Sequence, residues 1–231
     1  MSGVIQYLRV ILMVTVYLVR HCETMGNVLG IFQGTTDMDV SETGAKQLSF
    51  LGERFKSIHI DKIYSSPLLR ARKTANVIAE PKGLEVIVDN GLIEISGGII
   101  EGVELTYIFE HYPELEDTWC NDFQNFAPEG GEAIRDTYNR GWAALSKIIA
   151  ENDGKTIAVA SHGGLIRTLL CRLIKNDIEL IGEIPFSDNT AVAKIIFKDT
   201  KNWHVEYIND ISHLPKDMPR NPIVVNNEVK K

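Results

Sequence analysis

The sequence has few cysteines, no excess of positive charge and no hydrophobic run long enough to span a membrane. Its 231 residues include Cys22, Cys120 and Cys171, an odd number without paired spacing, which supports neither a disulfide framework nor a zinc site. The net charge is −7, so the chain has no general attraction for nucleic acid or an anionic membrane. We therefore expect a cytoplasmic protein with neither of these partners.

The chain also lacks internal repeats, low-complexity blocks and any linker rich in serine, proline or glycine. Its length suits one domain, although two small domains remain possible. We predict a single domain over 1–231, with a core at about 13–210, an insertion at about 95–130, an extension at 1–12 and a poorly ordered tail at 213–231. The sequence leaves the oligomeric state open.

An apolar run, VILMVTVYLV, occupies residues 10–19 and follows Arg9, as in the core of a signal peptide. It is too short to cross a bilayer as a helix, and no cleavage site of small residues follows it. Its β-branched residues favour a strand that is buried on both faces of a parallel sheet. We predict that strand, and take Met13 as a candidate start of the native protein.

Hydrophobic periodicity and turn signals predict strands that alternate with helices. Strands are predicted at 13–19, 60–66, 84–88, 156–161, 191–197 and 203–208. Helices are predicted at 41–56, 67–80, 131–151 and 163–174, with a short helix near 103–111 in an otherwise irregular segment from 89 to 130. This alternation indicates an α/β fold, a three-layer sandwich whose mainly parallel central sheet is flanked by helices.

Two predicted strands are each followed by a histidine, His21 and His162. Ligands of such sheets bind at the carboxyl ends of the strands, where both histidines lie. Arg20 and Arg70 are suited to gripping phosphate oxygens, and the glycines after His162 open a helix whose N–H groups favour anions. Each histidine could instead be structural, and Arg70 could belong to a solvated helix face.

Other phosphatase chemistries fit the sequence poorly. A cysteine phosphatase that used Cys22 would need an arginine at position 28, which is Val28. No cluster of Asp and His has the spacing of metal ligands, and no Gly-rich Walker-type loop is present. We therefore expect Cys22 to be a packed small side chain and the chemistry to be independent of metal and cofactor.

The motifs of the chain resemble, in order, those of the histidine phosphatase superfamily, the phosphoglycerate mutase-like proteins. They are Arg20-His21-Cys22-Glu23-Thr24 with Asn27, Phe32-Gln33-Gly34, Ser66-Pro67-Leu68-Leu69-Arg70-Ala71-Arg72-Lys73-Thr74-Ala75, Glu94 with Gly98 and Glu101-Gly102, Pro128-Glu129-Gly130-Gly131-Glu132, and Ser161-His162-Gly163-Gly164. The matches extend from about residue 14 to 195, and the resemblance implies a phosphoglycerate mutase-like fold.

The resemblance also implies roles for these residues. His21 would attack phosphorus and become a phosphohistidine, with its other ring nitrogen held by a backbone carbonyl, and Glu94 would act first as acid and then as base. The groups implied to bind the phosphoryl oxygens are Arg20, Arg70, His162, Asn27 and Gly163, while Gln33 and Gly34 would line the pocket edge. Two departures, Cys22 in place of glycine and Ile100 in place of tryptophan, affect substrate preference; Cys22 could narrow the pocket.

Charge favours a phosphatase over a mutase. Residues 101–132 contain nine acidic side chains and no lysine or arginine, which would repel a substrate with several negative charges. Six aromatic residues there suit a partly apolar small phosphate ester, or equally pack the insertion onto the core: Tyr107, Phe109, Tyr112, Trp119, Phe123 and Phe126. We predict a phosphatase acting on a small phosphorylated metabolite; the alternatives are a mutase and a non-catalytic module that binds phosphorylated ligands.

Overall fold

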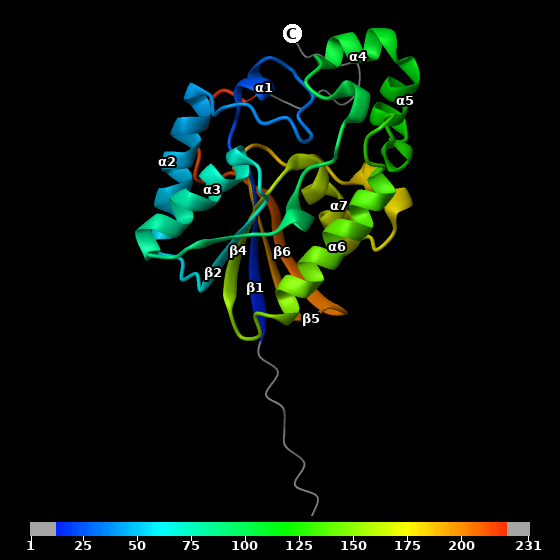
Figure 1. The fold of residues 1–231 in the computed structure, drawn as a ribbon. Helices are drawn as coiled ribbons and strands as arrows, with labels where there is room; N and C mark the ends of the chain where they lie inside the picture. Colours follow the sequence, from blue (N-terminus) through cyan, green and yellow to red (C-terminus); the bar gives the residue numbers. More distant parts are fainter. Residues whose placement is uncertain (1–12, 221–231) are drawn as a thin grey trace, which may run out of the picture.

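A six-stranded sheet forms the centre of the protein, for which the computed structural model describes residues 13–220 (Figure 1). The strands are β1 (Val14–Arg20), β2 (Lys62–Ser65), β3 (Val86–Val88), β4 (Thr156–Ser161), β5 (Val192–Asp199) and β6 (Asn202–Asp210). Their order is β3-β2-β4-β1-β5-β6; the first four are parallel, whereas β5 and β6 are antiparallel to their neighbours. The predicted α/β fold with a mainly parallel sheet is confirmed.

Helices cover both faces of this sheet, with α2 and α3 on one side and α6 and α7 on the other (Figure 1). The α-helices are α1 (Met25–Val28), α2 (Glu42–Lys56), α3 (Leu69–Ala79), α4 (Leu105–His111), α5 (Pro113–Asn121), α6 (Ile134–Ala150) and α7 (Gly163–Ile174). Short 3-10 helices are η1 (Glu80–Lys82), η2 (Asn90–Leu92), η3 (Gly98–Ile100), η4 (Phe123–Asn125) and η5 (Ile178–Glu183). None of the helices in residues 13–220 is long and apolar enough to cross a bilayer.

The apolar run near the N-terminus forms β1, between β4 and β5. Its side chains alternate between two cores because successive residues of a strand point to opposite faces. Val16 and Leu18 join the core under α6 and α7, whereas Tyr17 and Val19 join the core under α2 and α3. The predicted buried strand is confirmed from residue 14 onward, and the extension at 1–12 lies outside the described residues.

The insertion contains more regular structure than the sequence indicated. Helix α5 was not predicted, because Pro113 suggests a turn, yet this proline occupies the first turn of a helix, where its missing N–H costs nothing. The short helix α1 was also not predicted in the loop at 21–40. In α3 the first helical residue is Leu69 rather than Pro67, because Leu68 has an extended backbone (φ −68°, ψ 140°). The other predicted elements differ only at their ends.

The tail expected to be poorly ordered from residue 213 is in part described by the structure, as far as residue 220. The Leu214 side chain is buried, and the His213 ring contacts Arg54 and Thr190. Residues 221–231 lie outside the described part of the chain.

Candidate active site

The two histidines that the sequence singled out face each other at one edge of the sheet. His21 follows β1 and His162 follows β4, and these strands are adjacent and parallel, with Arg20 in register with Ser161. The His21 backbone N–H donates to the Ser161 carbonyl at 2.9 Å. The two imidazole centroids lie 5.3 Å apart, and both side chains are buried. The parallel register therefore brings the two motifs together.

His21 is held in one tautomer by the backbone. Its Nδ1 lies 2.7 Å from the carbonyl oxygen of Cys22, which can only accept, so Nδ1 carries the hydrogen and Nε2 has a lone pair. Burial, followed by the positive charges of Arg70 and Arg20, holds the pKa of His21 well below its ordinary 6.5. The imidazole is therefore neutral at physiological pH, as a nucleophile must be.

His162 is anchored through one nitrogen. Its Nε2 lies 2.6 Å from the Ser66 hydroxyl, just before α3. The pKa of His162 lies well below 6.5, mainly because the ring is buried and secondly because of the positive charge of Arg70. The Ser66 contact fixes the ring, so that its Nδ1 is left for another partner.

Arg20 and Arg70 are buried cations. Burial lowers the pKa of Arg20 to about 10, still above physiological pH. The Arg70 guanidinium is fully buried and donates to the carbonyl oxygens of Thr36, Gln33 and Gly34 at 2.8–2.9 Å. It also lies 3.3 Å from the Asp37 carboxylate. Arg70 is therefore part of the site's interior and not of a solvated helix face.

Three nitrogen atoms at this site have no hydrogen-bond partner among the described residues. They are Nε of Arg20, Nε of Arg70 and Nδ1 of His162, and all three are buried. A buried polar group without a partner costs about 1–3 kcal/mol. Each of these nitrogens can donate to an oxygen, and a tetrahedral anion offers several oxygens at once. The chemistry of the site thus matches a phosphoryl group.

Glu94 lies between η2 and η3, and its side chain contacts the start of helix α7. Its carboxylate accepts hydrogen bonds from the backbone N–H groups of Gly164 (2.9 Å), Leu165 (3.0 Å) and Ile95 (3.0 Å). His162, the N-cap residue of α7, makes no side-chain cap, so Glu94 satisfies two of the amides that a helix start leaves open. These amides, which the sequence suggested for an anionic ligand, instead hold the carboxylate in the pocket wall.

The four residues predicted to bind substrate, Asn27, Gln33, Gly34 and Gly163, divide into two groups. Asn27, Gln33 and Gly163 do line it. Gly34 is absent from the pocket lining in the described part of the chain, and it supplies a carbonyl to Arg70 instead. The Asn27 side-chain oxygen accepts from Thr24, in the capping box of α1.

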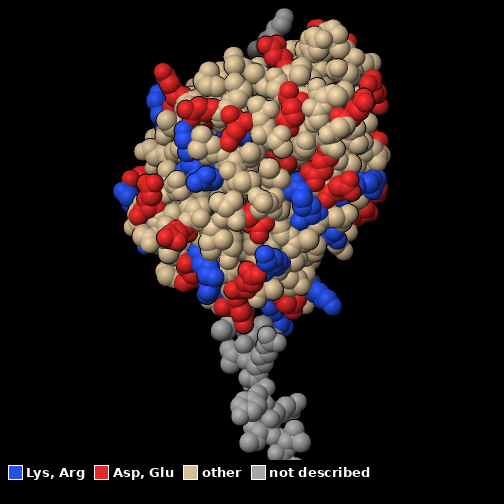
Figure 2. Space-filling view, viewed as in Figure 1, with Lys and Arg blue, Asp and Glu red and all other residues tan. Residues whose placement is uncertain are grey.

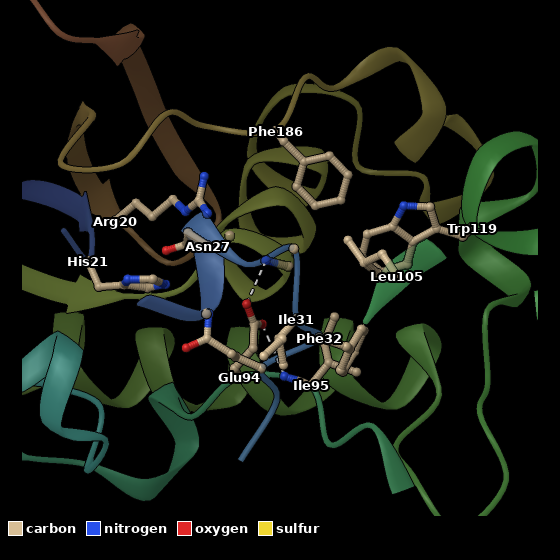
Figure 3. Close-up of a pocket in the computed structure, with 15 residues that line it drawn as sticks. Arg20, His21, Asn27, Ile31, Phe32, Glu94, Ile95, Leu105, Trp119 and Phe186 are labelled. Atoms are coloured by element: carbon tan, nitrogen blue, oxygen red, sulfur yellow. Dashed lines mark hydrogen bonds between the residues drawn. The ribbon is translucent and has the colours of Figure 1, made fainter. Parts of the chain in front are cut away.

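The pocket has a polar end and an apolar end (Figure 3). Figure 3 shows Arg20, His21, Asn27 and Glu94 at one end. The rest of the lining is formed by six apolar side chains, Ile31, Phe32, Ile95, Leu105, Trp119 and Phe186, of which Ile31 and Ile95 lie beside Glu94. Sequence reasoning missed most of this second set, since it lies outside the catalytic motifs; Phe186 in particular is in a loop with no recognisable pattern.

Cys22 is not among the described residues that line the pocket. Its side chain is fully buried, and burial raises the pKa of its thiol to about 11, so the thiolate is scarce at neutral pH. The expectation of a packed side chain is confirmed, and this buried side chain gives no support to the idea that Cys22 narrows the pocket. Residues 13–220 contain no group of three or more His, Cys, Asp or Glu that could hold a metal ion.

Two acidic residues of the insertion have partners within the protein. Figure 2 shows acidic and uncharged residues at its upper right, over α4. Glu101 accepts from the backbone N–H groups of Gly97, Thr35 and Thr36, and Glu132 pairs with Arg140 at 2.6 Å. From residues 101–132 the pocket receives two apolar side chains, Leu105 and Trp119. The part of the insertion that lines the pocket is therefore apolar, and the effect of its acidic residues on substrate charge stays a prediction.

Comparisons with known proteins identify similar sequences and structures. The family model described as histidine phosphatase superfamily (branch 1) matches residues 16–211. Phosphoserine phosphatase 1 of Hydrogenobacter thermophilus is 35% identical, over 82% of this chain and 90% of that protein. The probable phosphoglycerate mutase GpmB of Salmonella choleraesuis is 29% identical, over 87% and 95%. The structure of a mycobacterial glucosyl-3-phosphoglycerate phosphatase aligns with a TM-score of 0.78 and 27% identity, over 85% and 99%.

Proposed function

The chain belongs to the histidine phosphatase superfamily, and we propose that it is a phosphatase that hydrolyses small phosphate monoesters through a phosphohistidine on His21. The observation that carries the proposal is the set of unpaired nitrogens on Arg20, Arg70 and His162 around the neutral His21 ring. Phosphatases among its relatives support hydrolysis as the reaction.

The proposed reaction has two steps. In the first, Nε2 of His21 attacks phosphorus; the bond from phosphorus to the alcohol oxygen breaks, and that oxygen leaves with the bonding pair and takes a proton from Glu94. In the second, water attacks the phosphohistidine and gives a proton to Glu94, while the phosphorus–nitrogen pair returns to Nε2. The sum is ester plus water to alcohol plus phosphate.

The buried cations would stabilise the charge of the phosphoryl group as it moves. Arg20 and Arg70 are oriented before substrate arrives, because backbone carbonyls hold parts of both guanidinium groups. Hydrogen-bond donors that are already fixed in a buried site need not reorient as charge develops, so no free energy of reorganisation is required during the reaction. His162 would add a neutral donor through Nδ1, and Asn27 and Gly163 lie close by in the pocket wall.

Hydrolysis is favoured over mutase transfer by the pocket lining. A mutase must hold a second anionic group while the phosphoryl group moves between two oxygens of one skeleton. Arg20 is the one Lys or Arg that lines the pocket as described, and it lies at the polar end beside His21. A non-catalytic binding module is disfavoured because the site has a neutral histidine with an available lone pair and a carboxylate in the same pocket.

Hydrolysis of p-nitrophenyl phosphate in excess EDTA tests this function. We expect turnover by the wild type and its loss in His21→Ala, together with loss of an acid-labile phosphoryl label from the protein. His111→Ala is a matched control, because His111 lies on the exposed face of α4. Absence of turnover by the wild type would favour the binding module, and mutase turnover well above phosphate release would favour the mutase.

We also propose that the protein is cytoplasmic and that it forms a single domain. Cys22, Cys120 and Cys171 are all free thiols, which is typical of a reducing cytoplasm. The strands from Val14 to Asp210 belong to one sheet, which supports a single domain with 95–130 as its insertion.

A further inference from the structure

We propose that the pocket takes phosphate esters of uncharged, largely apolar alcohols, and that Trp119 and Phe186 form the wall that recognises the alcohol. The inference rests on the proposed function, because it concerns the leaving group of the same reaction. It differs from the substrate of the similar phosphoserine phosphatase, whose alcohol carries a carboxylate and an ammonium group.

The apolar end of the pocket gives the alcohol no charged partner. Six apolar side chains line this part of the pocket, and they come from four separate parts of the chain: the loop after α1, the segment after Glu94, helices α4 and α5, and the loop after η5. Within the described pocket lining, the charged side chains are Arg20 and Glu94, both at the polar end.

A carboxylate on the alcohol would therefore be buried without a cation. Moving an unpaired charge from water to apolar surroundings is strongly unfavourable, whereas an alkyl or aryl group gains from the same transfer. An ammonium group would meet the same apolar surface. The lining thus discriminates between charged and apolar alcohols by the free energy of their desolvation as well as by their shape.

The wall of Trp119 and Phe186 is rigidly built. Their rings are stacked, with centroids 5.7 Å apart and planes 21° from parallel. The Arg167 guanidinium lies 4.3 Å from the Phe186 centroid and 4.5 Å from that of Phe123, and its Nε donates to the Ile184 carbonyl at 2.7 Å. Such cation–π contacts are strongest away from water, and Arg167 is buried. We assign Arg167 as a positioning residue for Phe186.

Arg167 packs against this wall, but it does not line the described pocket. Its charge packs against the Phe186 ring instead of facing the alcohol. Phe186 therefore has two effects: it offers an apolar surface, and it keeps a buried cation out of the pocket. Removal of the ring should weaken binding of apolar alcohols and favour anionic ones.

The apolar surface continues outside the pocket. Val28 and Leu29, at the end of α1, are about half exposed, and so is Tyr107 on α4. The Leu105 N–H donates to the Gly30 carbonyl at 2.8 Å, which joins α4 to the loop after α1, and both of these residues line the pocket. A longer alkyl or aryl group would thus meet an apolar rim.

A matched pair of esters tests the inference directly. Butyl phosphate and 4-(phosphonooxy)butanoate have the same chain length, and differ in a terminal methyl or carboxylate group. We expect kcat/KM to be at least about tenfold higher for butyl phosphate, from the transfer of its end group alone. The inference would be overturned if kcat/KM were equal or higher for the carboxylate ester than for butyl phosphate. A kcat/KM for phosphoserine equal to or higher than that for phenethyl phosphate would overturn it as well.

Variants of the wall add a second readout. We expect Trp119→Ala and Phe186→Ala each to lower kcat/KM for phenethyl phosphate about tenfold or more, with little change for methyl phosphate. Phe186→Ala should also reduce the preference for butyl phosphate over its carboxylate partner, and adding Arg167→Met should restore it. Phe50→Ala is the control, since this ring is exposed on α2 and lies outside the pocket lining of the described chain.

A variant that should gain activity still tests the inference if a wall variant does not fold. Leu105→Arg puts a cation into the apolar lining at the first residue of α4, and it should raise kcat/KM for 4-(phosphonooxy)butanoate. Unchanged preference in every folded variant would contradict the assignment of the wall. Hydrolysis that depends on His21 but prefers anionic alcohols would leave the proposed function standing and overturn this inference alone; no hydrolysis of any ester would overturn both.

Discussion

The carboxylate of Glu94 accepts a hydrogen bond of 2.9 Å from the backbone N–H of Gly164, in the first turn of helix α7. This helix begins directly after His162, so one contact joins the proposed acid and base to the element that carries the second histidine. Glu94 therefore has a structural effect and a chemical one, and substitutions can separate them.

We expect Glu94→Gln to keep most of the helix cap but lose proton transfer. An amide oxygen still accepts from the α7 N–H groups, so stability should change little, whereas kcat should fall about 10²–10⁴-fold. Glu94→Ala should in addition lower the free energy of unfolding by about 1 kcal/mol, the usual cost of a lost cap. Urea denaturation and steady-state kinetics measure the two effects; near wild-type kcat in Glu94→Gln would exclude the acid and base role.

Arg70 should not tolerate lysine. Its guanidinium donates to three carbonyls at once and presents Nε to the site, a fork that a single ammonium group cannot reproduce. We expect Arg70→Lys to weaken inhibition by inorganic phosphate or vanadate at least about tenfold, the loss of one charged hydrogen bond. Arg72→Lys, on the same helix, is the control and should bind these anions normally; equal affinity in both variants would show that Arg70 does not contact the anion.

Acid should destabilise the protein partly through His213. Burial, then the charge of Arg54, lowers the pKa of His213 from 6.5 to about 4. Between these values the unfolded chain binds the proton and the folded chain does not, so the free energy of unfolding falls as the pH drops from about 6.5 towards 4.

The matched variant for this effect is His213→Gln, which cannot titrate. We expect its urea midpoint to fall less than that of the wild type between pH 7 and pH 4.5. His59→Gln, at an exposed position, should follow the wild type. Parallel curves for His213→Gln and the wild type would show that this ring is not held neutral.

Alkylation should spare Cys22. Its thiol is fully buried and its raised pKa of about 11 leaves little thiolate, the reactive form, at neutral pH. We expect iodoacetamide to modify the partly exposed Cys120 first and to leave phosphatase activity intact. Peptide mass spectrometry identifies the modified residue, and Cys22→Ser should remain active; rapid inactivation with label on Cys22 would revive a cysteine nucleophile.

The sequence was sufficient to predict the α/β architecture and the two histidine motifs. Apolar runs and turn residues report local backbone structure, and the carboxyl ends of parallel strands must meet at one edge, so His21 and His162 could be expected to approach. The helix α5 escaped prediction because it is only nine residues long and buries just two side chains, Leu115 and Trp119, so its apolar pattern is short.

The tertiary structure alone decided which apolar side chains line the pocket and which partners hold the charged groups. Phe186 reaches the pocket because Arg167 and Trp119 pack against it, and Arg70 is buried because the loop at 33–37 wraps its guanidinium. These contacts join segments far apart in the chain, and their geometry depends on how whole elements pack. The sequence thus determined the proposed reacting groups, since they lie in short motifs at the strand ends, whereas long-range packing determined the apolar part of the pocket that we propose to bind the alcohol.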